Sequence, residues 1–424
     1  MYKKSEQLLE RALGSIPLAS QTFSKSLTQY PRGVSPFFIE KGEGSRVWDV
    51  DGNEYIDFVN SLAAITIGYC DKDVDSAVQK QMKNGVTFSL PHCLEMEVAE
   101  ELIDIIPCAE KVRFAKNGTD ATSASIRIAR AYTGKEHVAV CGYHGWQDWY
   151  IGSTTRDLGV PKSVKDLTHK FEYNNIDSLE RIFQQYELAC VIMEPMNAEY
   201  PKSDFLEKVK KLAHENNALL IFDETITGFR YSLGGAQELF DVVPDLATFG
   251  KGMANGYPLS AVVGSNNVMQ KVEDIFFSGT FGGETLSLAA AKAVISKYKQ
   301  EKVSEHLFKV GMYLLERLSQ LINDQKLDDI FRVSGHPSWN FLHVKEQQEY
   351  NNFEIKTFFL QEMFKRGILT LGSHILSFSH TKEDIDKLLM AYSEVLPMIK
   401  RHIDNQTLLE NVQGEILKPL FKVR

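Results

Sequence analysis

Two patterns of hydrophobic positions alternate from about residue 72 onward. Short apolar runs, typical of strands buried on both faces, are followed by stretches with apolar residues at helical spacing. The runs predict strands at 112–115, 137–141, 190–194, 219–222 and 245–249. The helical stretches are 73–84, 94–106, 123–132 and 205–216. Because strands and helices alternate, we expect a parallel sheet with right-handed crossovers.

The two ends of the chain show other patterns. Residues 1–30 predict an amphipathic helix and a polar link, and 36–40, 44–50 and 55–58 predict short antiparallel strands around an Asp51-Gly52-Asn53 turn. A long helix at 286–299 is followed by a mixture of elements: helices at 304–323, 354–366 and 382–402, and strands near 330–333 and 340–343.

These patterns predict an α/β fold in three parts. Residues 1–60 form a helix and short strands that pack with the smaller domain. Residues 61–285 form a large domain with a mostly parallel sheet, and residues 286–424 form a smaller α+β domain.

Composition narrows the classes of function. The 424 residues are 43% hydrophobic and 24% charged, with a net charge of −9, which argues against nucleic acid or an anionic membrane as a partner. Five scattered cysteines give neither a disulfide framework nor a metal site. No apolar run reaches membrane-spanning length and the N-terminus lacks the apolar core of a signal peptide, so we expect a cytoplasmic protein.

Two residues at predicted strand ends carry the candidate chemistry. Asp223 ends the apolar run that starts at Leu219, and Lys251 lies between Gly250 and Gly252 just after the 245–249 strand. Open parallel sheets bind ligands at the carboxyl ends of their strands. A lysine that reacts with an aldehyde and an aspartate that protonates a ring nitrogen are the two groups that pyridoxal phosphate (PLP) requires. We therefore predict Lys251 and Asp223 as catalytic residues, although singly they also fit a solvated lysine and a helix cap.

Other polar residues follow neighbouring strands. Asn117-Gly118-Thr119 stands where a strand gives way to a helix, and free N–H groups at such a junction bind phosphate. Tyr143 and His144 follow the 137–141 strand, where an aromatic ring could cover a planar cofactor. Glu194 and Glu199 follow the 190–194 strand. A capped helix and ordinary core packing are the alternative interpretations.

Longer motifs then place the chain in a family. The segments VWDVDGNEYIDF, KNGTDATSASIRIARAYTG, GYHG, IFDETITGFR, TFGKGMANGYPLSAVVG and SHTKEDIDKLL occur in order over nearly the full length. The chain resembles class III (fold type I) PLP-dependent aminotransferases, most closely the subgroup similar to glutamate-1-semialdehyde aminomutase.

The resemblance implies roles for individual residues. Lys251 would be the Schiff-base lysine, Asp223 the partner of the pyridine nitrogen and Tyr143 the stacking ring, with His144 and Glu194 also at family positions. Asn117, Gly118 and Thr119 match the phosphate loop. Thr280, in GTFGGE, matches a threonine that reaches the phosphate of the neighbouring subunit, so a homodimer with shared active sites is expected.

Departures from the family pattern bear on the substrate. Glu199 matches ω-aminotransferases, in which a glutamate pairs with an arginine that binds the donor's α-carboxylate, but Ser377 stands at the position of that arginine. Gly372 replaces a glutamate of the aminomutase-like pattern. His374 and Trp146 are further candidate substrate contacts, with a structural histidine as the alternative interpretation of His374. Aromatic residues beside the cofactor suit a sugar-derived carbonyl.

Several functions follow from this sequence. The leading hypothesis is transfer of an amino group from an amino acid, glutamate foremost, to an aldehyde or ketone, with a sugar-derived carbonyl of glycan biosynthesis as a candidate acceptor. Intramolecular aminomutase chemistry and a PLP-dependent racemase or epimerase are the alternatives. A PLP-binding regulator without turnover is a further alternative, but residues 1–60 offer no basic helix-turn-helix.

Overall fold

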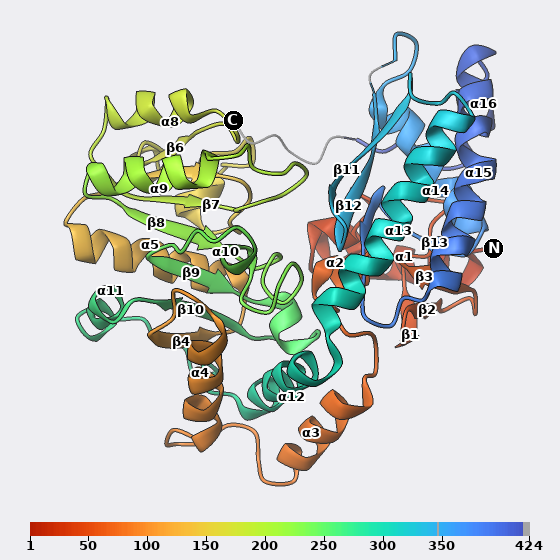
Figure 1. Ribbon diagram of the computed structural model, residues 1–424. Helices are drawn as coiled ribbons and strands as arrows, with labels where there is room; N and C mark the ends of the chain where they lie inside the picture. The colour runs from red at the N-terminus through yellow and green to blue at the C-terminus, as the bar shows by residue number, and fades with distance from the viewer. Residues whose placement is uncertain (346, 419–424) are drawn as a thin grey trace. The chain divides into compact units, whose positions relative to one another are not determined.

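The chain forms two compact units that are not continuous in sequence. A computed structural model describes residues 1–345 and 347–418. Unit 1 combines Met1–Asp71 with the segment that begins at Glu305, and unit 2 spans Lys72–Ser304 (Figure 1).

Unit 2 is built on one seven-stranded sheet. Its strands lie in the order β4-β10-β9-β8-β7-β5-β6. Only β10 is antiparallel to its neighbours, and every other adjacent pair is parallel, which confirms the predicted mostly parallel α/β sheet. The bounds are β4 Lys111–Ala115, β5 His137–Cys141, β6 Thr168–Lys170, β7 Leu188–Met193, β8 Leu219–Asp223, β9 Leu246–Phe249 and β10 Ser260–Gly264.

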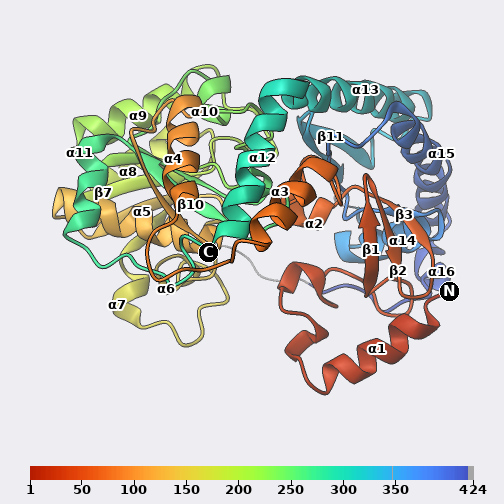
Figure 2. The same cartoon turned by 90° about the horizontal axis from the view of Figure 1, so that it is seen from below.

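Helices flank this sheet and connect its strands. The longer ones are α3 Lys72–Met82, α4 Cys93–Ile105, α5 Gly118–Thr133, α8 Ile176–Phe183, α9 Phe205–Glu215 and α12 Thr285–Glu301. Helix α12 packs along both α3 and α4, as Figure 2 shows from below. Helix α5 begins at Gly118 rather than at the predicted Ser123, because its first turn is polar and has no hydrophobic period. The Asn117 N–H donates to Asp120 Oδ2 (2.8 Å) and caps this end.

The sheet is buried on both faces, which fixes its strand ends. All five residues of β8 are buried. Leu219 and Ile221 belong to a core cluster with Ile126 and Ile128 of α5. Because side chains alternate along a strand, Leu220 and Phe222 point to the opposite face. A strand held from both sides delivers its last residue, Asp223, to a well-defined position.

Unit 1 joins the two ends of the chain in common sheets. The strand order β1-β2-β3-β13 brings the N-terminal strands beside a C-terminal one, and β13 runs parallel to β3. A second sheet has the order β11-β12-β14. The bounds are α1 Lys3–Leu13, β1 Ile39–Glu43, β2 Arg46–Asp49, β3 Glu54–Asp57, α13 Val303–Asp324, β11 Phe331–His336, β12 Trp339–Val344, α14 Asn352–Lys365, β13 Ile368–Leu369, β14 Ser373–Ile375, α15 Lys382–Asp404 and α16 Leu408–Asn411.

A left-handed turn of four non-glycine residues follows β3. Residues 60–63 have φ of 45°, 51°, 60° and 69°. L-residues in this conformation cost roughly 1–2 kcal/mol each, so surrounding contacts must hold the turn. The buried Asp57 carboxylate accepts the N–H groups of Val59 (2.7 Å) and Asn60 (3.0 Å) and the hydroxyl of Tyr69 (2.7 Å). The Asn60 side chain donates to Ile375 O (2.6 Å).

The turn forms part of the wall of a cavity within unit 1. The cavity, of about 390 Å³, is lined mainly by apolar and aromatic residues, together with Ser61, Leu62 and Lys25. The Lys25 amine donates to Ser61 Oγ over 3.3 Å. The backbone direction of the turn therefore decides which side chains face this cavity.

In the two described ranges, no helix is both long enough and apolar enough to cross a membrane.

The role of Asp57 leads to a prediction about stability. Asp57→Ala leaves the buried N–H groups of Val59 and Asn60 without their acceptor, so it should lower the free energy of unfolding by about 2–4 kcal/mol. Urea unfolding followed by circular dichroism measures this. Glu43→Ala, at an exposed position of β1, is the control and should change little. An Asp57→Ala protein as stable as the parent would show that the carboxylate does not hold the turn.

Candidate active site

Four loops of unit 2 leave the same edge of the sheet. Strands β5, β7, β8 and β9 are mutually parallel, so their carboxyl ends share one rim. Asp223 is the last residue of β8, and the loops after β5, β7 and β9 carry Tyr143 and His144, Glu194, and Lys251 in turn. Polar side chains that the sequence scatters over more than a hundred residues thus meet at one edge, the usual ligand site of an open parallel sheet.

The Asp223 carboxylate on this rim takes part in four hydrogen bonds. Its Oδ1 accepts the Thr225 N–H (3.1 Å), the Thr225 hydroxyl (2.6 Å) and the Thr248 hydroxyl (3.0 Å), and its Oδ2 lies 2.8 Å from His144 Nδ1. Burial alone would raise the pKa of this carboxyl, but the hydrogen bonds from His144 and Thr225 outweigh burial and hold its pKa below the ordinary value. Asp223 is therefore a buried negative charge at the strand end.

His144 links this carboxylate to the preceding strand. Its Nδ1 faces Asp223 Oδ2, and its Nε2 lies 3.2 Å from Cys141 O, at the end of β5. The ring is buried and lies roughly parallel to the indole of Trp149, with the ring centroids 6.3 Å apart. With acceptors at both nitrogens and an aromatic neighbour, His144 cannot rotate without losing contacts, and it thereby orients Asp223.

Glu194 is a second buried acid on the rim, and the pKa of its carboxyl is shifted in the opposite direction to that of Asp223. Its Oε2 accepts the Tyr143 N–H (3.1 Å) and the Asn197 side-chain amide (3.0 Å). Burial raises the pKa of this carboxyl above its ordinary value. A Cβ at Gly142, where φ is +107°, would come within 2.4 Å of Glu194 Oε2, so only glycine allows this close approach. Glu194 thus holds the start of the loop that carries Tyr143.

Lys251 occupies a strained backbone position after β9. Its φ is +45°, whereas Gly250 is extended at −177°, so the lysine and not the glycine before it takes the left-handed conformation. Such strain in a non-glycine residue is characteristic of functional sites. Burial lowers the pKa of the Lys251 amine, although the Asp223 and Glu194 charges act in the opposite direction. A lowered pKa makes more of the amine neutral and able to react with an aldehyde.

The N-terminus of α5 supplies a binding place for an anion. Gly118 and Thr119 are the first residues of this sixteen-residue helix, and their N–H groups have no acceptor within the helix. A Cβ on Gly118 would come within 2.9 Å of the Thr225 side chain, so the helix end packs closely against the Asp223 loop. The buried Thr119 Oγ1 has no hydrogen-bond partner in the described structure and lies beneath Gly145.

These groups fit pyridoxal phosphate. A phosphate oxygen at the end of α5 would give the Thr119 hydroxyl the partner that it lacks. The ionised Asp223 is suited to a protonated ring nitrogen, and the Lys251 amine to an aldehyde carbon. Among the described residues, no three His, Cys, Asp or Glu side chains converge on a point where they could hold a metal ion.

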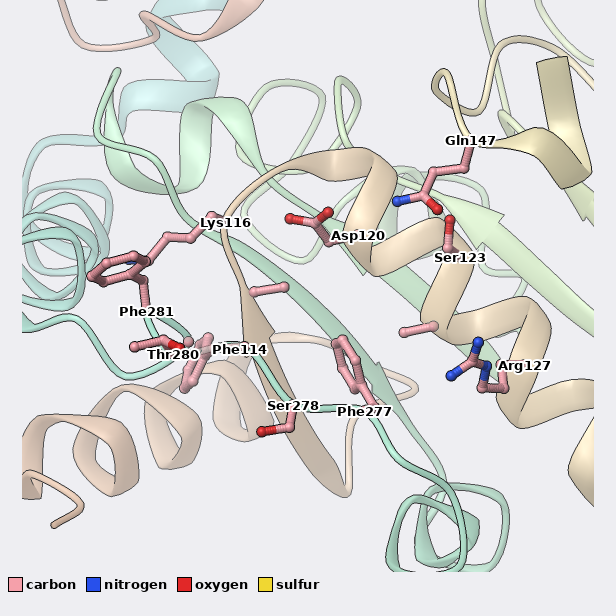
Figure 3. Close-up of a pocket in the computed structure, with 14 residues that line it drawn as sticks. Phe114, Lys116, Asp120, Ser123, Arg127, Gln147, Phe277, Ser278, Thr280 and Phe281 are labelled. Atoms are coloured by element: carbon pink, nitrogen blue, oxygen red, sulfur yellow. The ribbon is translucent and has the colours of Figure 1, made fainter. Parts of the chain in front are cut away.

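Thr280 lies in the exposed loop before α12. With Phe281, Phe114, Lys116 and Arg127 it lines a hollow of about 350 Å³ beside α5, shown in Figure 3. Lys116 Nζ forms an ion pair with Glu284 (3.0 Å), which fixes the loop against β4. Thr280 is therefore presented at the surface of unit 2.

The three substrate candidates lie in different surroundings. Trp146 (68% exposed) and Glu199 are exposed on rim loops of unit 2. His374 belongs to unit 1 and is fully buried, with Nδ1 2.6 Å from Asn340 Oδ1 and Nε2 2.5 Å from Tyr392 OH. Burial lowers the pKa of His374 to about 3. Both ring nitrogens are used within the unit, an arrangement that favours a structural role.

Two aromatic residues near this rim belong to the core. Trp149 and Tyr150 are buried on the short helix α6 (Asp148–Ile151). The Trp149 indole N–H donates to Ser123 Oγ (2.9 Å), and the Tyr150 hydroxyl donates to Gly142 O (2.8 Å). The exposed aromatic surface beside the GYHG segment therefore consists of Tyr143 (52% exposed) and Trp146.

Two threonines of the site were not singled out from the sequence. Thr225 follows Asp223 by two residues, a spacing at which an aspartate often accepts a local backbone hydrogen bond. This spacing can be read directly from the sequence of residues 222–225, FDET. Thr248 reaches Asp223 only because β8 and β9 pair in a register that sets the two residues side by side. No local pattern reports such a register.

The chain was next compared with known proteins. The family model for class III aminotransferases matches residues 29–396. A 3-aminobutyryl-CoA aminotransferase of Cloacimonas acidaminovorans is 34% identical over 410 residues, covering 94% of this chain and 98% of the relative. A glutamate-1-semialdehyde 2,1-aminomutase of Francisella philomiragia is 34% identical over 423 residues, covering 91% and 96%.

The fold agrees with this relationship. A PLP-bound structure of the FumI protein of Sphingopyxis sp. MTA144 superposes with a TM-score of 0.88 at 26% identity, covering 97% of this chain and 99% of that one. The predicted fold type I architecture and the predicted cofactor, pyridoxal phosphate, are thereby confirmed. The chain belongs to the class III, PLP-dependent aminotransferases.

Proposed function

We propose that this enzyme transfers an amino group from L-glutamate to a sugar-derived aldehyde or ketone, with Lys251 and Asp223 as its catalytic residues. The observation that carries the catalytic assignment is the meeting of a strained, half-buried lysine and a buried, ionised aspartate at the ends of adjacent strands. The Thr119 hydroxyl, buried without a partner in the described structure, supports a phosphate-bearing cofactor at the same rim.

Each residue has a defined task in the proposal. The Lys251 amine would hold the cofactor at its aldehyde carbon and would move the proton at the substrate carbon. Asp223 keeps the ring nitrogen protonated, and His144 orients Asp223. When bound, pyridoxal phosphate supplies an electron-accepting ring. Asn117, Gly118 and Thr119 bind the phosphate, Tyr143 covers the ring, and Glu194 fixes the Tyr143 backbone.

The proposed acceptor class is supported by the surface around the rim. Tyr143 and Trp146 expose aromatic faces there, and such faces pack on the C–H surfaces of sugar rings. Glu199 adds a carboxylate that accepts hydrogen bonds from hydroxyl groups. Ser377 replaces the arginine that binds the donor carboxylate in related ω-aminotransferases, so glutamate must be bound by other groups.

We also propose a cytoplasmic homodimer with shared active sites. The Thr280 loop is tied to the α3–α4 loop by a hydrogen bond from Thr285 N to Val86 O (3.0 Å). Phe88, Leu90 (79% exposed) and Phe281 are exposed on these two loops. Exposed apolar side chains of this size favour an interface, which would bring Thr280 to the partner's cofactor phosphate.

The donor can be tested in a single turnover. PLP-loaded protein mixed with L-glutamate should lose the absorbance of the lysine-bound cofactor and release one equivalent of 2-oxoglutarate. Amino transfer is reversible, so an amino sugar can take the place of glutamate as donor. Mixing the loaded protein with the amino sugars kanosamine or D-glucosamine therefore tests the proposed sugar class in the reverse direction. Lys251→Ala, which cannot hold the cofactor covalently, is the control.

The alternatives predict other results. An aminomutase, the activity of the Francisella relative, would convert glutamate-1-semialdehyde without an external donor. A racemase or epimerase would exchange the substrate's α-proton with solvent without releasing an oxo acid. Either result, with no reaction of glutamate, would overturn the proposed amino transfer.

Thr119 allows a test of the phosphate site that does not depend on turnover. Thr119→Val is nearly isosteric and removes a hydroxyl that has no partner without cofactor, so apoenzyme stability should stay within about 0.5 kcal/mol. The Kd for pyridoxal phosphate should rise about 5- to 100-fold, the equivalent of roughly 1–3 kcal/mol. Fluorescence titration measures the affinity. Thr133→Val, at the other end of α5, should leave it unchanged, and equal affinities for all three proteins would refute the assignment.

Asp223 allows a test of the ring-nitrogen partner. Asp223→Asn keeps the size of the side chain but removes the charge that stabilises the protonated ring, so kcat should fall at least 100-fold, about 3 kcal/mol or more. Asp241→Asn, the same change at an exposed position of unit 2, is the matched control. Stopped-flow absorbance with L-glutamate measures both, and near-normal turnover in Asp223→Asn would contradict the role.

A further inference from the structure

The loop after β7 carries Glu199 and Tyr200, both of which are exposed. Glu199 and Tyr200 lie between the buried Glu194 and helix α9. Tyr200 is 48% exposed, and its ring stands edge-on to Phe240, with the centroids 6.4 Å apart and an interplanar angle of 89°. A carboxylate and a phenol on consecutive residues are suited to hydroxyl groups of a ligand. Such a pair contributes affinity only if its loop is held in place.

The start of this loop is anchored to the rim. The Asn197 side-chain amide donates to Glu194 Oε2 (3.0 Å), and the Tyr173 hydroxyl donates to Pro195 O (2.7 Å). Tyr173 is itself packed edge-on against Phe205 of α9, with the centroids 5.2 Å apart. These contacts fix the residues before Glu199.

At the far end of the loop, the Asn174 side chain makes two hydrogen bonds to the backbone. Its Oδ1 accepts the Lys202 N–H (2.8 Å), and its Nδ2 donates to Tyr200 O (3.0 Å). The Lys202 amine also donates back to Asn174 O (3.4 Å). The Asn174 amide therefore bridges the backbone on both sides of Pro201, immediately after the two exposed side chains.

The position of Asn174 suits this bridge. It lies in the turn between β6 and α8, and β6, β5 and β7 are neighbouring parallel strands, so their carboxyl ends share the rim. Its φ is +62°, a left-handed conformation that asparagine tolerates better than other non-glycine residues. An amide also offers both a donor and an acceptor, whereas an aspartate offers only acceptors when ionised and would face Tyr200 O without a hydrogen.

We propose that Asn174 is a positioning residue that holds Glu199 and Tyr200 as a hydroxyl-recognising subsite for the sugar part of the substrate. This inference rests on the sugar-derived substrate class proposed above. Glutamate has no hydroxyl groups that could donate to Glu199, so it does not use this subsite. Loosening the loop therefore weakens amino sugars as substrates and leaves glutamate nearly unaffected.

Asn174→Gly tests the bridge without straining the backbone, because glycine adopts φ of +62° freely. Asn174→Asp keeps the acceptor for Lys202 N–H and loses the donor to Tyr200 O. Asn175→Ala is the matched control, since the neighbouring Asn175 amide donates to Glu172 and not to the loop. Each protein is loaded with pyridoxal phosphate and mixed in a stopped-flow instrument with kanosamine, D-glucosamine or L-glutamate. Amide hydrogen exchange of residues 197–202 is measured in parallel.

For Asn174→Gly we expect the half-saturating concentration of the amino sugars to rise at least 10-fold, with a limiting rate within twofold of the parent. The half-saturating concentration of L-glutamate should stay within twofold of the parent's. Amide hydrogen exchange at Lys202 should accelerate at least 10-fold. The half-saturating concentrations and the exchange rate of Asn174→Asp should lie between those of the parent and of Asn174→Gly. Those of Asn175→Ala should match the parent's.

Other results would distinguish an error in the role of Asn174 from an error in the proposed substrate class. If the parent reacts with the amino sugars and Asn174→Gly reacts with them equally well, the positioning role is wrong and the proposed substrate class stands. If Lys202 exchanges at the parent's rate in Asn174→Gly, Asn174 does not hold the loop. A parent protein that reacts with L-glutamate but with neither amino sugar would overturn the substrate class and, with it, this subsite.

Discussion

The site depends on keeping one carboxylate ionised inside the protein. Removing a charge from water is costly, and Asp223 stays ionised because His144, Thr225 and Thr248 together supply four hydrogen bonds to its two oxygens. Each donor comes from a different place: a loop after β5, the residue two positions on, and the adjacent strand. Packing of the sheet against helices on both faces holds these donors in position. The chemistry at the rim is therefore a consequence of the core beneath it.

A second buried acid on the same rim behaves in the opposite way. Glu194 accepts two hydrogen bonds, from the Tyr143 N–H and the Asn197 amide, and burial raises the pKa of this carboxyl. Two neighbouring carboxyls with pKa values shifted in opposite directions can serve different purposes, one as a fixed charge and one as a scaffold for loops. The hydrogen bonds to Tyr143 and Asn197 give Glu194 the second purpose.

Two of the left-handed backbone segments lie at the candidate site and along a cavity wall. Lys251 takes a left-handed conformation between two glycines, and four residues after β3 form a left-handed turn along a cavity. In each case the backbone adopts a conformation that the isolated chain would avoid. Hydrogen bonds to the Asp57 carboxylate hold the turn in unit 1 in this conformation. Strain of this kind fixes side-chain directions more tightly than an unstrained loop does.

The sequence by itself determined the alternation of strands and helices, the family and its cofactor, and it singled out Lys251 and Asp223 as the candidate catalytic residues, because these depend on local periodicity and on motifs with fixed spacing. It did not determine that Thr248 pairs with Asp223, that Trp149 packs into the core, or that the Asn174 amide bridges a distant loop. It also left His374 open between substrate contact and structural histidine, and its buried bonds to Asn340 and Tyr392 favour the latter. Strand register and the direction of a side chain depend on contacts between segments far apart in sequence, so only the tertiary structure decided them.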